Sequence, residues 1–474
     1  MAMVEQRHHA STTATGLEAA TTRAAPPPLE LGGRRVVVIG LGASGIAAAR
    51  LCRAHGAEVT AADLQPLEQL CPEARELAAL GIELQGGNDQ PAALATAELI
   101  VVSPGVPAGP ALAAAERSGA TVIGELELGA RFLSAPVLLV GGTNGKSTVT
   151  ALCGDMLRAA GQSVFVGGNF GTPLCDAVGS RWDALVVEIS SFQAERVPTL
   201  HARVHALLNV SEDHLDRYPS FQAYADAKGN PFVAMGAEDV AVIPAGDPAC
   251  AAQAARGRAR VVTFSAELDA DVALRGAEIV DRVHDGRYPL SLLTLQGRHN
   301  VANACAAIAA TAALGASPAA IAAALGAFCG LAHRTVLVAE RDGVRYFDDS
   351  KGTNVGAAVA ALRGMHEPRA VLIAGGRDKL GAYEPLVAAL RERGRALVVL
   401  GEAAERIAQA AAGALPVVRV TSLREAVHAA RELARPGDAV LLSPACSSYD
   451  MFRNYKERGE AFAAAVRAEL EGTP

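Results

Sequence analysis

Short apolar runs that end in glycine-rich or polar turns recur along the chain, and the segments between them have helical spacing. The first run, at 34–40, leads into a helical pattern at 46–55. Similar rhythms restart near residue 136 and near residue 333. Buried strands that alternate with helices are typical of a parallel, doubly wound sheet. The pattern therefore predicts an α/β protein built from three such blocks.

The expected elements can be given block by block. In the first block we expect strands at 34–40, 58–61, 98–102 and 121–123, with helices at 46–55 and 71–80. In the second we expect strands at 136–141, 184–189 and 205–210, with helices at 221–228 and 300–313. In the third we expect strands at 344–347, 370–374, 396–400, 417–420 and 439–442.

The length of 474 residues agrees with three blocks, since a domain has about 150 residues. We expect a disordered tail at 1–33, a Rossmann-like domain at 34–125, a central P-loop ATPase-like domain with a parallel sheet at 126–330, and a C-terminal Rossmann-like domain at 331–474. The tail is rich in alanine and threonine and lacks an apolar signal core. A transit peptide is the alternative interpretation of this segment.

Composition excludes several classes of function. The net charge is −7 and aromatic residues make up 4%, which argues against general nucleic-acid binding. No apolar run reaches the roughly 18 residues that a membrane helix needs, so no membrane partner is expected. The eight cysteines form no CxxC pair and are interpreted as buried, reduced thiols. We therefore expect a cytoplasmic protein.

Two glycine-rich turns each follow a strand and open a helix. Residues 40–45 read GxGxxG, and Asp63 ends the next strand, which is the pattern of dinucleotide binding. A fold of this type that binds nothing there is the alternative. Residues 141–148 contain Gly145 followed by Lys146 and Ser147, and these two side chains suit phosphates and Mg²⁺. The strict phosphate-loop pattern has a glycine at position 140, where this chain has Val140. Together the two turns suggest one nucleotide substrate plus ATP.

Polar groups follow further strands of the second and third blocks. Glu188 ends a strand and suits Mg²⁺, and Asp213, His214 and Asp216 follow another strand. Taken alone, Lys228 is interpreted as a surface lysine. Three polar loops of the third block, at 348–354, 375–379 and 443–449, predict a binding rim at one sheet edge.

These residues resemble the Mur ligases of peptidoglycan synthesis, from about Leu31 to the C-terminus. The matching segments are 141–148, 188–193, 209–218, 298–300, 333–334, 349–354, 375–379 and 443–455. The residues at 102–105, 349–354 and 443–446 are similar to those of the glutamate-adding members.

The resemblance implies a role for each candidate residue. UDP-sugar contacts would come from Gly42, Ala43, Ser44, Asp63, Ser103, Asn169 and His214, so the first turn would serve UDP rather than NAD. ATP contacts would come from Gly142, Thr143, Asn144, Gly145, Lys146, Ser147, Thr148, Asn300, Arg334 and Asp349. Two Mg²⁺ ions would be held by Ser147, Glu188, His214 and a carbamylated Lys228. Glutamate would contact Lys351, Thr353, Lys379, Ser448 and Tyr455. The catalytic group would be Lys146, Glu188, His214 and Lys228.

The implied reaction is ATP-dependent addition of D-glutamate to UDP-N-acetylmuramoyl-L-alanine through an acyl phosphate, by a monomer. Four alternatives stay open on the sequence alone: the same reaction with L-glutamate, a folylpolyglutamate-type ligase, an NAD(P)-dependent oxidoreductase and a non-catalytic nucleotide-binding protein.

Overall fold

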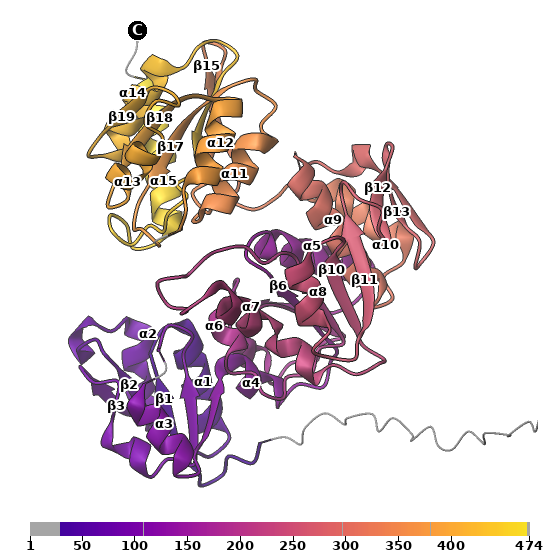
Figure 1. Cartoon of the computed structure of the whole chain (residues 1–474). Coiled ribbons are helices and arrows are strands. Elements are labelled where there is room, and N and C mark those ends of the chain that lie inside the picture. The colour runs from indigo at the N-terminus through magenta and orange to yellow at the C-terminus, as the bar shows by residue number, and fades with distance from the viewer. Residues whose placement is uncertain (1–28, 108, 296, 380, 472–474) are drawn as a thin grey trace, which may run out of the picture.

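The computed structural model describes residues 29–107, 109–295, 297–379 and 381–471, and it contains three separate sheets (Figure 1). Residues 1–28 of the expected tail lie outside the described residues. Within the described ranges, no helix is long and apolar enough to cross a membrane. Six of the eight cysteines are buried as predicted, whereas Cys71 and Cys329 are exposed.

The first sheet is five-stranded and parallel, in the order β3-β2-β1-β4-β5. Its strands are β1 (Arg35–Ile39), β2 (Glu58–Asp63), β3 (Glu83–Gly86), β4 (Leu99–Val102) and β5 (Thr121–Gly124). Its helices are α1 (Ala43–Ala54), α2 (Pro72–Arg75), α3 (Pro110–Arg117) and α4 (Glu125–Ala130). The helix expected at 71–80 is a single α-helical turn, α2, that continues as the 3₁₀ segment η2 (Glu76–Leu80).

The second sheet has nine strands in the order β14-β13-β12-β11-β10-β9-β6-β8-β7. The strands are β6 (Val137–Gly141), β7 (Val164–Gly168), β8 (Ala184–Glu188), β9 (Val204–Leu207), β10 (Val240–Pro244), β11 (Arg260–Ser265), β12 (Val272–Arg275), β13 (Glu278–Asp281) and β14 (Gly286–Pro289). The last three pair in antiparallel fashion. The helices are α5 (Lys146–Ala159), α6 (Ser191–Ala194), α7 (Phe221–Gly229), α8 (Pro248–Ala254), α9 (Arg298–Ala312) and α10 (Pro318–Ala327).

Alternate residues of the central strands point into two apolar cores, because side chains alternate across a sheet. Leu138 and Val140 pack under α5 and α9 on one face, while Leu139 packs with α7 on the other. Both faces are therefore covered, which fits the continuous apolar runs of these strands.

The third sheet has the order β15-β16-β20-β17-β18-β19, with β15 antiparallel to β16. The strands are β15 (Val336–Arg341), β16 (Val344–Asp348), β17 (Ala370–Gly375), β18 (Gly394–Leu400), β19 (Val417–Arg419) and β20 (Ala439–Leu442). The helices are α11 (Val355–Gly364), α12 (Glu384–Arg393), α13 (Ala404–Ala410), α14 (Leu423–Leu433) and α15 (Tyr455–Glu471).

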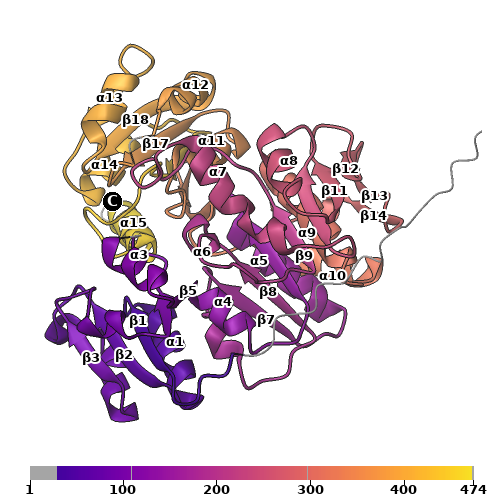
Figure 2. The same ribbon diagram turned by 60° about the horizontal axis from the view of Figure 1, so that its bottom comes forward.

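The first and third units lie on the same side of the central unit (Figures 1 and 2). The polar loops predicted from the sequence follow the carboxyl ends of strands β6, β8 and β9 in the central sheet and β16, β17 and β20 in the third. Ligands of open α/β sheets bind at that edge. The fold therefore brings loops from different units toward one another.

Candidate active site

The phosphate loop (residues 141–148) joins β6 to α5, and its shape depends on two glycines. Gly142 has φ +134° and Gly145 has φ +86°, a region that residues with a Cβ rarely adopt. A Cβ on Gly145 would also lie 2.5 Å from Asn303 Oδ1. Gly145 caps α5 without a side-chain hydrogen bond, so the first N–H groups of the helix stay available to an anion.

Hydrogen bonds from the loop after β9 hold the phosphate loop in place. Asn209 Oδ1 accepts from the Asn144 backbone N–H at 2.9 Å, and Asn209 Nδ2 donates to the Asn144 carbonyl at 3.1 Å. The Thr143 hydroxyl lies 3.0 Å from the Tyr224 hydroxyl and accepts from Ser211 N–H at 3.1 Å. These hydrogen bonds fix the conformation of the phosphate loop.

Two lysines converge on this loop. Lys146 Nζ donates to the carbonyls of Gly142 (2.9 Å) and Thr143 (2.8 Å), and Lys228 Nζ donates to the same Gly142 carbonyl at 2.7 Å. Lys228 is only 5% exposed, so its interpretation as a surface lysine is wrong. Burial lowers the pKa of both amines. Repulsion by Lys146 lowers the pKa of Lys228 further.

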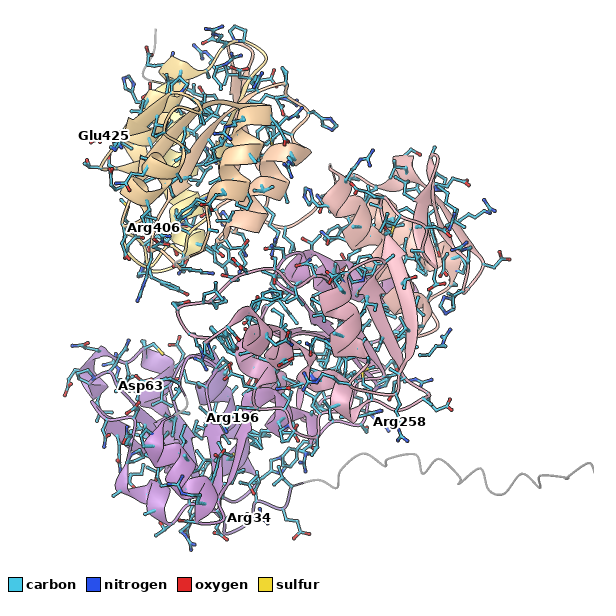
Figure 3. The ribbon with its side chains drawn as sticks, in the orientation of Figure 1. Arg34, Asp63, Arg196, Arg258, Arg406 and Glu425 are labelled. Atoms are coloured by element: carbon cyan, nitrogen blue, oxygen red, sulfur yellow. The ribbon has the colours of Figure 1, made fainter. Side chains whose placement is uncertain are left out.

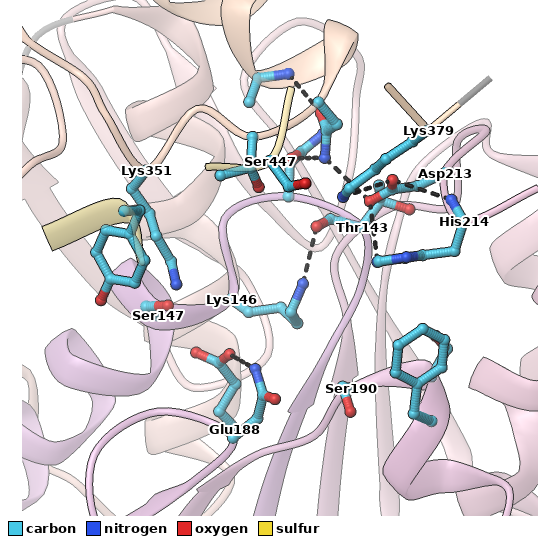
Figure 4. A pocket seen from close by; sticks show the side chains of 18 of the residues that line it. Thr143, Lys146, Ser147, Glu188, Ser190, Asp213, His214, Lys351, Lys379 and Ser447 are labelled. Carbon is cyan, nitrogen blue, oxygen red and sulfur yellow. Dashed lines mark hydrogen bonds and ion pairs between the residues drawn. The ribbon is translucent and has the colours of Figure 1, made fainter. Parts of the chain in front are cut away.

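Glu188 ends β8 below Lys146 and is 2% exposed (Figure 4). Its Oε1 accepts from Asn169 Nδ2 at 2.7 Å, while its Oε2 is buried and has no hydrogen-bond partner among the described residues. A buried carboxylate oxygen with no donor suits a hard cation. Within the described ranges, no three His, Cys, Asp or Glu side chains are grouped to hold a metal. Any ion at Glu188 would therefore need other oxygen ligands, such as phosphates or Ser147.

Asp213 and His214 lie in the loop after β9, where His214 has a positive φ of 55°. Asp213 Oδ1 accepts from Lys379 Nζ at 3.0 Å and from the His214 N–H at 3.0 Å. Burial, helped by the nearby Lys379 charge, lowers the pKa of His214 to about 4. The ring is therefore neutral near pH 7 and keeps a lone pair for a metal or a hydrogen bond.

The third unit closes the site from the other side. Arg334 Nη2 donates to Ser147 Oγ at 3.1 Å, and Asn354 Nδ2 donates to Asn144 Oδ1 at 3.0 Å. The Lys351 ammonium lies 3.9 Å from the centre of the Tyr455 ring. In Figure 4, Lys351 lies near Ser147, and the end of Lys379 lies at Asp213.

These side chains surround a cavity of about 410 Å³. It brings together predicted residues from two units, namely Thr143, Asn144, Gly145, Lys146, Ser147, Asn169, Glu188, His214, Lys228, Arg334, Lys351, Thr353, Lys379, Ser448 and Tyr455. The first unit contributes Pro104, which directly follows Ser103. Lys146, Lys351, Lys379 and Arg334 in a single cavity favour anionic ligands.

A second cavity of about 180 Å³ adjoins the first on the far side of the phosphate loop. Thr148, Asn300, Arg334 and Asp349 line it, together with apolar groups that include Phe264. Burial raises the pKa of Asp349 to about 7, although its Oδ2 accepts from Ser443 Oγ at 2.6 Å. An elongated ligand with a phosphate end and an apolar end can span both cavities.

The turn at 40–45 is built as the sequence predicts. Asp63 Oδ2 accepts from the Leu41 N–H at 2.6 Å, and Ser103 Oγ donates to the Gly40 carbonyl at 2.7 Å. A Cβ on Gly45 would lie 1.8 Å from that carbonyl, so only glycine fits. Gly42 caps α1 without a side-chain bond, which leaves the N–H groups of Ala43 and Ser44 free for a phosphate. Figure 3 shows Asp63 in the first unit.

Three family models match consecutive parts of the chain: "Mur ligase MurD-like, N-terminal domain" at 34–124, "Mur ligase middle domain" at 140–311 and "Mur ligase, glutamate ligase domain" at 333–446. A UDP-N-acetylmuramoylalanine–D-glutamate ligase from Geobacter metallireducens is 44% identical over 93% of this chain and 98% of its own length. The chain belongs to the Mur ligase family. An enzyme with the same name from Syntrophotalea carbinolica is 45% identical over 94% of this Mur ligase and 99% of its own length.

The fold of this Mur ligase is also similar to that of a pseudomurein peptide ligase type C from Methanothermus fervidus. The TM-score is 0.61 at 18% identity, over 92% of this chain and 100% of the other. The family is ATP-dependent and generally uses Mg²⁺. The turn at 40–45 lies inside a Mur ligase N-terminal domain, so the oxidoreductase interpretation loses its basis.

Sequence reasoning about this Mur ligase assigned no role to several residues that line the larger cavity, among them Tyr224 and Asn354. Tyr224 holds Thr143 and lies 4.7 Å from Lys228 Nζ, measured to its ring centre. Helical spacing could have identified it, because positions four apart share one helix face. Asn354 links the phosphate loop to the third unit and also donates to Asp213 at 3.3 Å. The sequence placed Asn354 in a predicted polar loop, but its contact with Asn144, 210 positions away, could not be predicted from either segment.

Proposed function

We propose that this Mur ligase joins D-glutamate to the L-alanyl carboxylate of UDP-N-acetylmuramoyl-L-alanine, with conversion of ATP to ADP and phosphate, in peptidoglycan precursor synthesis. The names of its 44–45% identical relatives support this assignment. The observation that carries it is the cavity in which cationic groups of the central and third units face one another. Two acids and ATP repel one another in water, and this cavity offsets the repulsion.

The proposed reaction has two steps and passes through an acyl phosphate. The substrate carboxylate attacks the γ-phosphorus of ATP, ADP leaves, and an acyl phosphate forms. The amine of glutamate then attacks the acyl carbon, phosphate leaves with the C–O bonding pair, and the amine loses a proton. Lys146 and Arg334 are placed to bind the phosphates, while Lys351, Lys379 and Ser448 are placed to orient glutamate. Closure between units excludes the water that would hydrolyse the acyl phosphate.

Mg²⁺ would neutralise phosphate charge and polarise the transferred group. Ser147 and Glu188 fit one ion, since no group in the described part of the chain donates a hydrogen bond to Glu188 Oε2. His214 and a carbamylated Lys228 fit a second. The lowered pKa of Lys228 favours the carbamate, because only a neutral amine adds CO₂. The carbamate is an anion and can bind a hard cation, whereas an ammonium group cannot.

We assign the UDP moiety to the turn at 40–45 with Asp63 and Ser103. We place the three domains at 34–125, 126–330 and 331–474. We also propose a monomer, because one chain supplies the described walls of the larger cavity. A cytoplasmic location follows from the proposed use of ATP. Equilibrium sedimentation tests the monomer, and a result at twice 48.5 kDa would contradict it.

The decisive experiment measures ADP and phosphate release from purified protein with ATP, Mg²⁺ and the muramoyl nucleotide. D-glutamate and L-glutamate are supplied in parallel, with a third sample lacking amino acid. We expect one ADP per amide formed, with D-glutamate preferred. Preference for L-glutamate would support the runner-up function. No ADP with either enantiomer would refute ligase activity on this nucleotide.

A further inference from the structure

Arg458, in the first turns of α15, is a buried charge outside the groups discussed so far, and it is 3% exposed. Its Nε donates to Ser350 Oγ at 3.0 Å, its Nη2 to the Ser350 carbonyl at 2.8 Å and its Nη1 to the Cys446 carbonyl at 3.2 Å. All three acceptors are neutral loop atoms rather than carboxylates. Burying a cation against neutral acceptors is costly, and an apolar side chain of similar volume would pack more cheaply.

The acceptors belong to loops that carry the proposed glutamate contacts. Ser350 directly precedes Lys351 in the loop after β16, and Cys446 lies two positions before Ser448 in the loop after β20. The Ser350 hydroxyl in turn donates to the carbonyl of Tyr455 at 2.8 Å. One guanidinium therefore ties two of these loops to the start of α15.

The third loop, after β17, packs against the same group. A Cβ on Gly376 would lie 3.2 Å from Arg458 Nη1 and 2.3 Å from the Ser447 carbonyl, so this glycine permits the contact. Arg377 N–H donates to the Ser447 carbonyl at 2.9 Å, and Ser447 N–H donates to the Arg377 carbonyl at 3.3 Å. The position of Lys379, two residues further on, is thereby coupled to the loop that Arg458 holds.

The next residue of α15 allows the helix to lie this close. A Cβ on Gly459 would lie 2.2 Å from His333 Nδ1 and 2.7 Å from Asp348 Oδ2. These two groups are paired at 2.6 Å and flank the loop that Ser350 begins. The arginine and the glycine therefore serve one arrangement, in which α15 is seated at the junction of the three loops.

We propose that Arg458 is a positioning residue for the amino-acid pocket, holding the loops that carry Lys351, Lys379 and Ser448 in register without touching a substrate. The inference rests on the proposed function, since it assigns glutamate to that pocket. The planar guanidinium suits the task, because its donors point in fixed, diverging directions. Lysine has one flexible nitrogen and cannot join the same atoms.

The test compares Arg458→Met with the control Arg467→Met. Arg467 is an exposed arginine on the same helix. For Arg458→Met we expect kcat/KM for glutamate to fall about 10- to 100-fold through a raised KM, as loops misplaced by about 1 Å lose pocket geometry. The KM for ATP and the amount of acyl phosphate trapped by borohydride without glutamate should stay within about twofold. Arg467→Met should match the parent protein in every measurement.

A chemical rescue separates positioning from general stability. Arg458→Ala should regain part of its glutamate kcat/KM with millimolar guanidinium, whereas a merely structural lesion would not respond selectively. If Arg458→Met does not fold, Arg458→Lys takes its place. We expect this variant also to raise the KM for glutamate, by a smaller factor. An unchanged glutamate KM, or an equal loss of acyl-phosphate formation, overturns the inference. If the parent protein itself makes no amide, the proposed function has failed instead.

Discussion

Replacing Lys146 with methionine tests the electrostatic basis of the site. The side chain becomes one atom shorter, and it loses its charge and its hydrogen bonds to the Gly142 and Thr143 carbonyls. Burial lowers the pKa of Lys146, which means that the folded protein disfavours its charge. Lys228 lies against the same loop and repels it. We therefore expect the folding stability of Lys146→Met to equal or slightly exceed that of the parent protein.

Catalysis should respond in the opposite direction. A cation about 4 Å from a developing negative charge is worth roughly 4 kcal/mol at an effective dielectric of about 20. A loss of that size corresponds to about 10³-fold in rate, and removal of one preorganised donor alone costs about 10²-fold. We therefore expect kcat to fall by about 10²-fold or more.

The assay is ADP release with the muramoyl nucleotide and glutamate at saturation, combined with thermal unfolding of the same samples. Lys456→Met, at an exposed position on α15, is the control and should keep full activity. Near-normal turnover of Lys146→Met would refute the role of this lysine. A large fall in melting temperature together with lost activity would show that the loop, rather than the charge, had failed.

Three further changes follow: two test other parts of the site, and the third tests the stability of the fold. Lys228→Ala should cripple turnover, with partial recovery by added short-chain carboxylates; undiminished turnover at low bicarbonate would count against a carbamate. Glu188→Gln should raise the Mg²⁺ concentration for half-maximal activity about 10- to 100-fold, by analogy with lost metal-site contacts, and an unchanged Mg²⁺ titration would exclude Glu188 as a ligand. His205, on β9, has both ring nitrogens buried, and neither has a hydrogen-bond partner within the residues that the structure describes. His205→Leu should therefore stabilise the fold by about 1–3 kcal/mol in urea unfolding. Burial lowers the pKa of His205 from 6.5 to about 3. Between pH 6.5 and pH 3, this histidine is therefore protonated in the unfolded chain and neutral in the folded chain. The gain from His205→Leu should therefore grow as pH falls through that window, and a gain independent of pH would contradict the reasoning.

Features that depend on neighbours in the chain could be predicted from the sequence. The turn at 40–45 and the phosphate loop each need glycines, with a strand directly before them and a helix directly after them in the chain. The structure shows the glycine at position 45 to be required by a Cβ clash and that at position 145 by its positive φ. The fold class followed for the same reason, because apolar runs of strand length report burial directly.

Features that depend on contacts between distant segments were decided by the tertiary structure alone. Lys228 meets the Gly142 carbonyl across 86 positions, and only that burial turns an ordinary lysine into a weakly basic amine. Arg458 meets Ser350 across 108 positions, and Lys379 meets Asp213 across 166. The antiparallel extension β12–β14 was missed because its short strands carry little apolar periodicity. Local pattern records which side chains are present, whereas the charge state and partner of a buried group are set by whatever the fold packs against it.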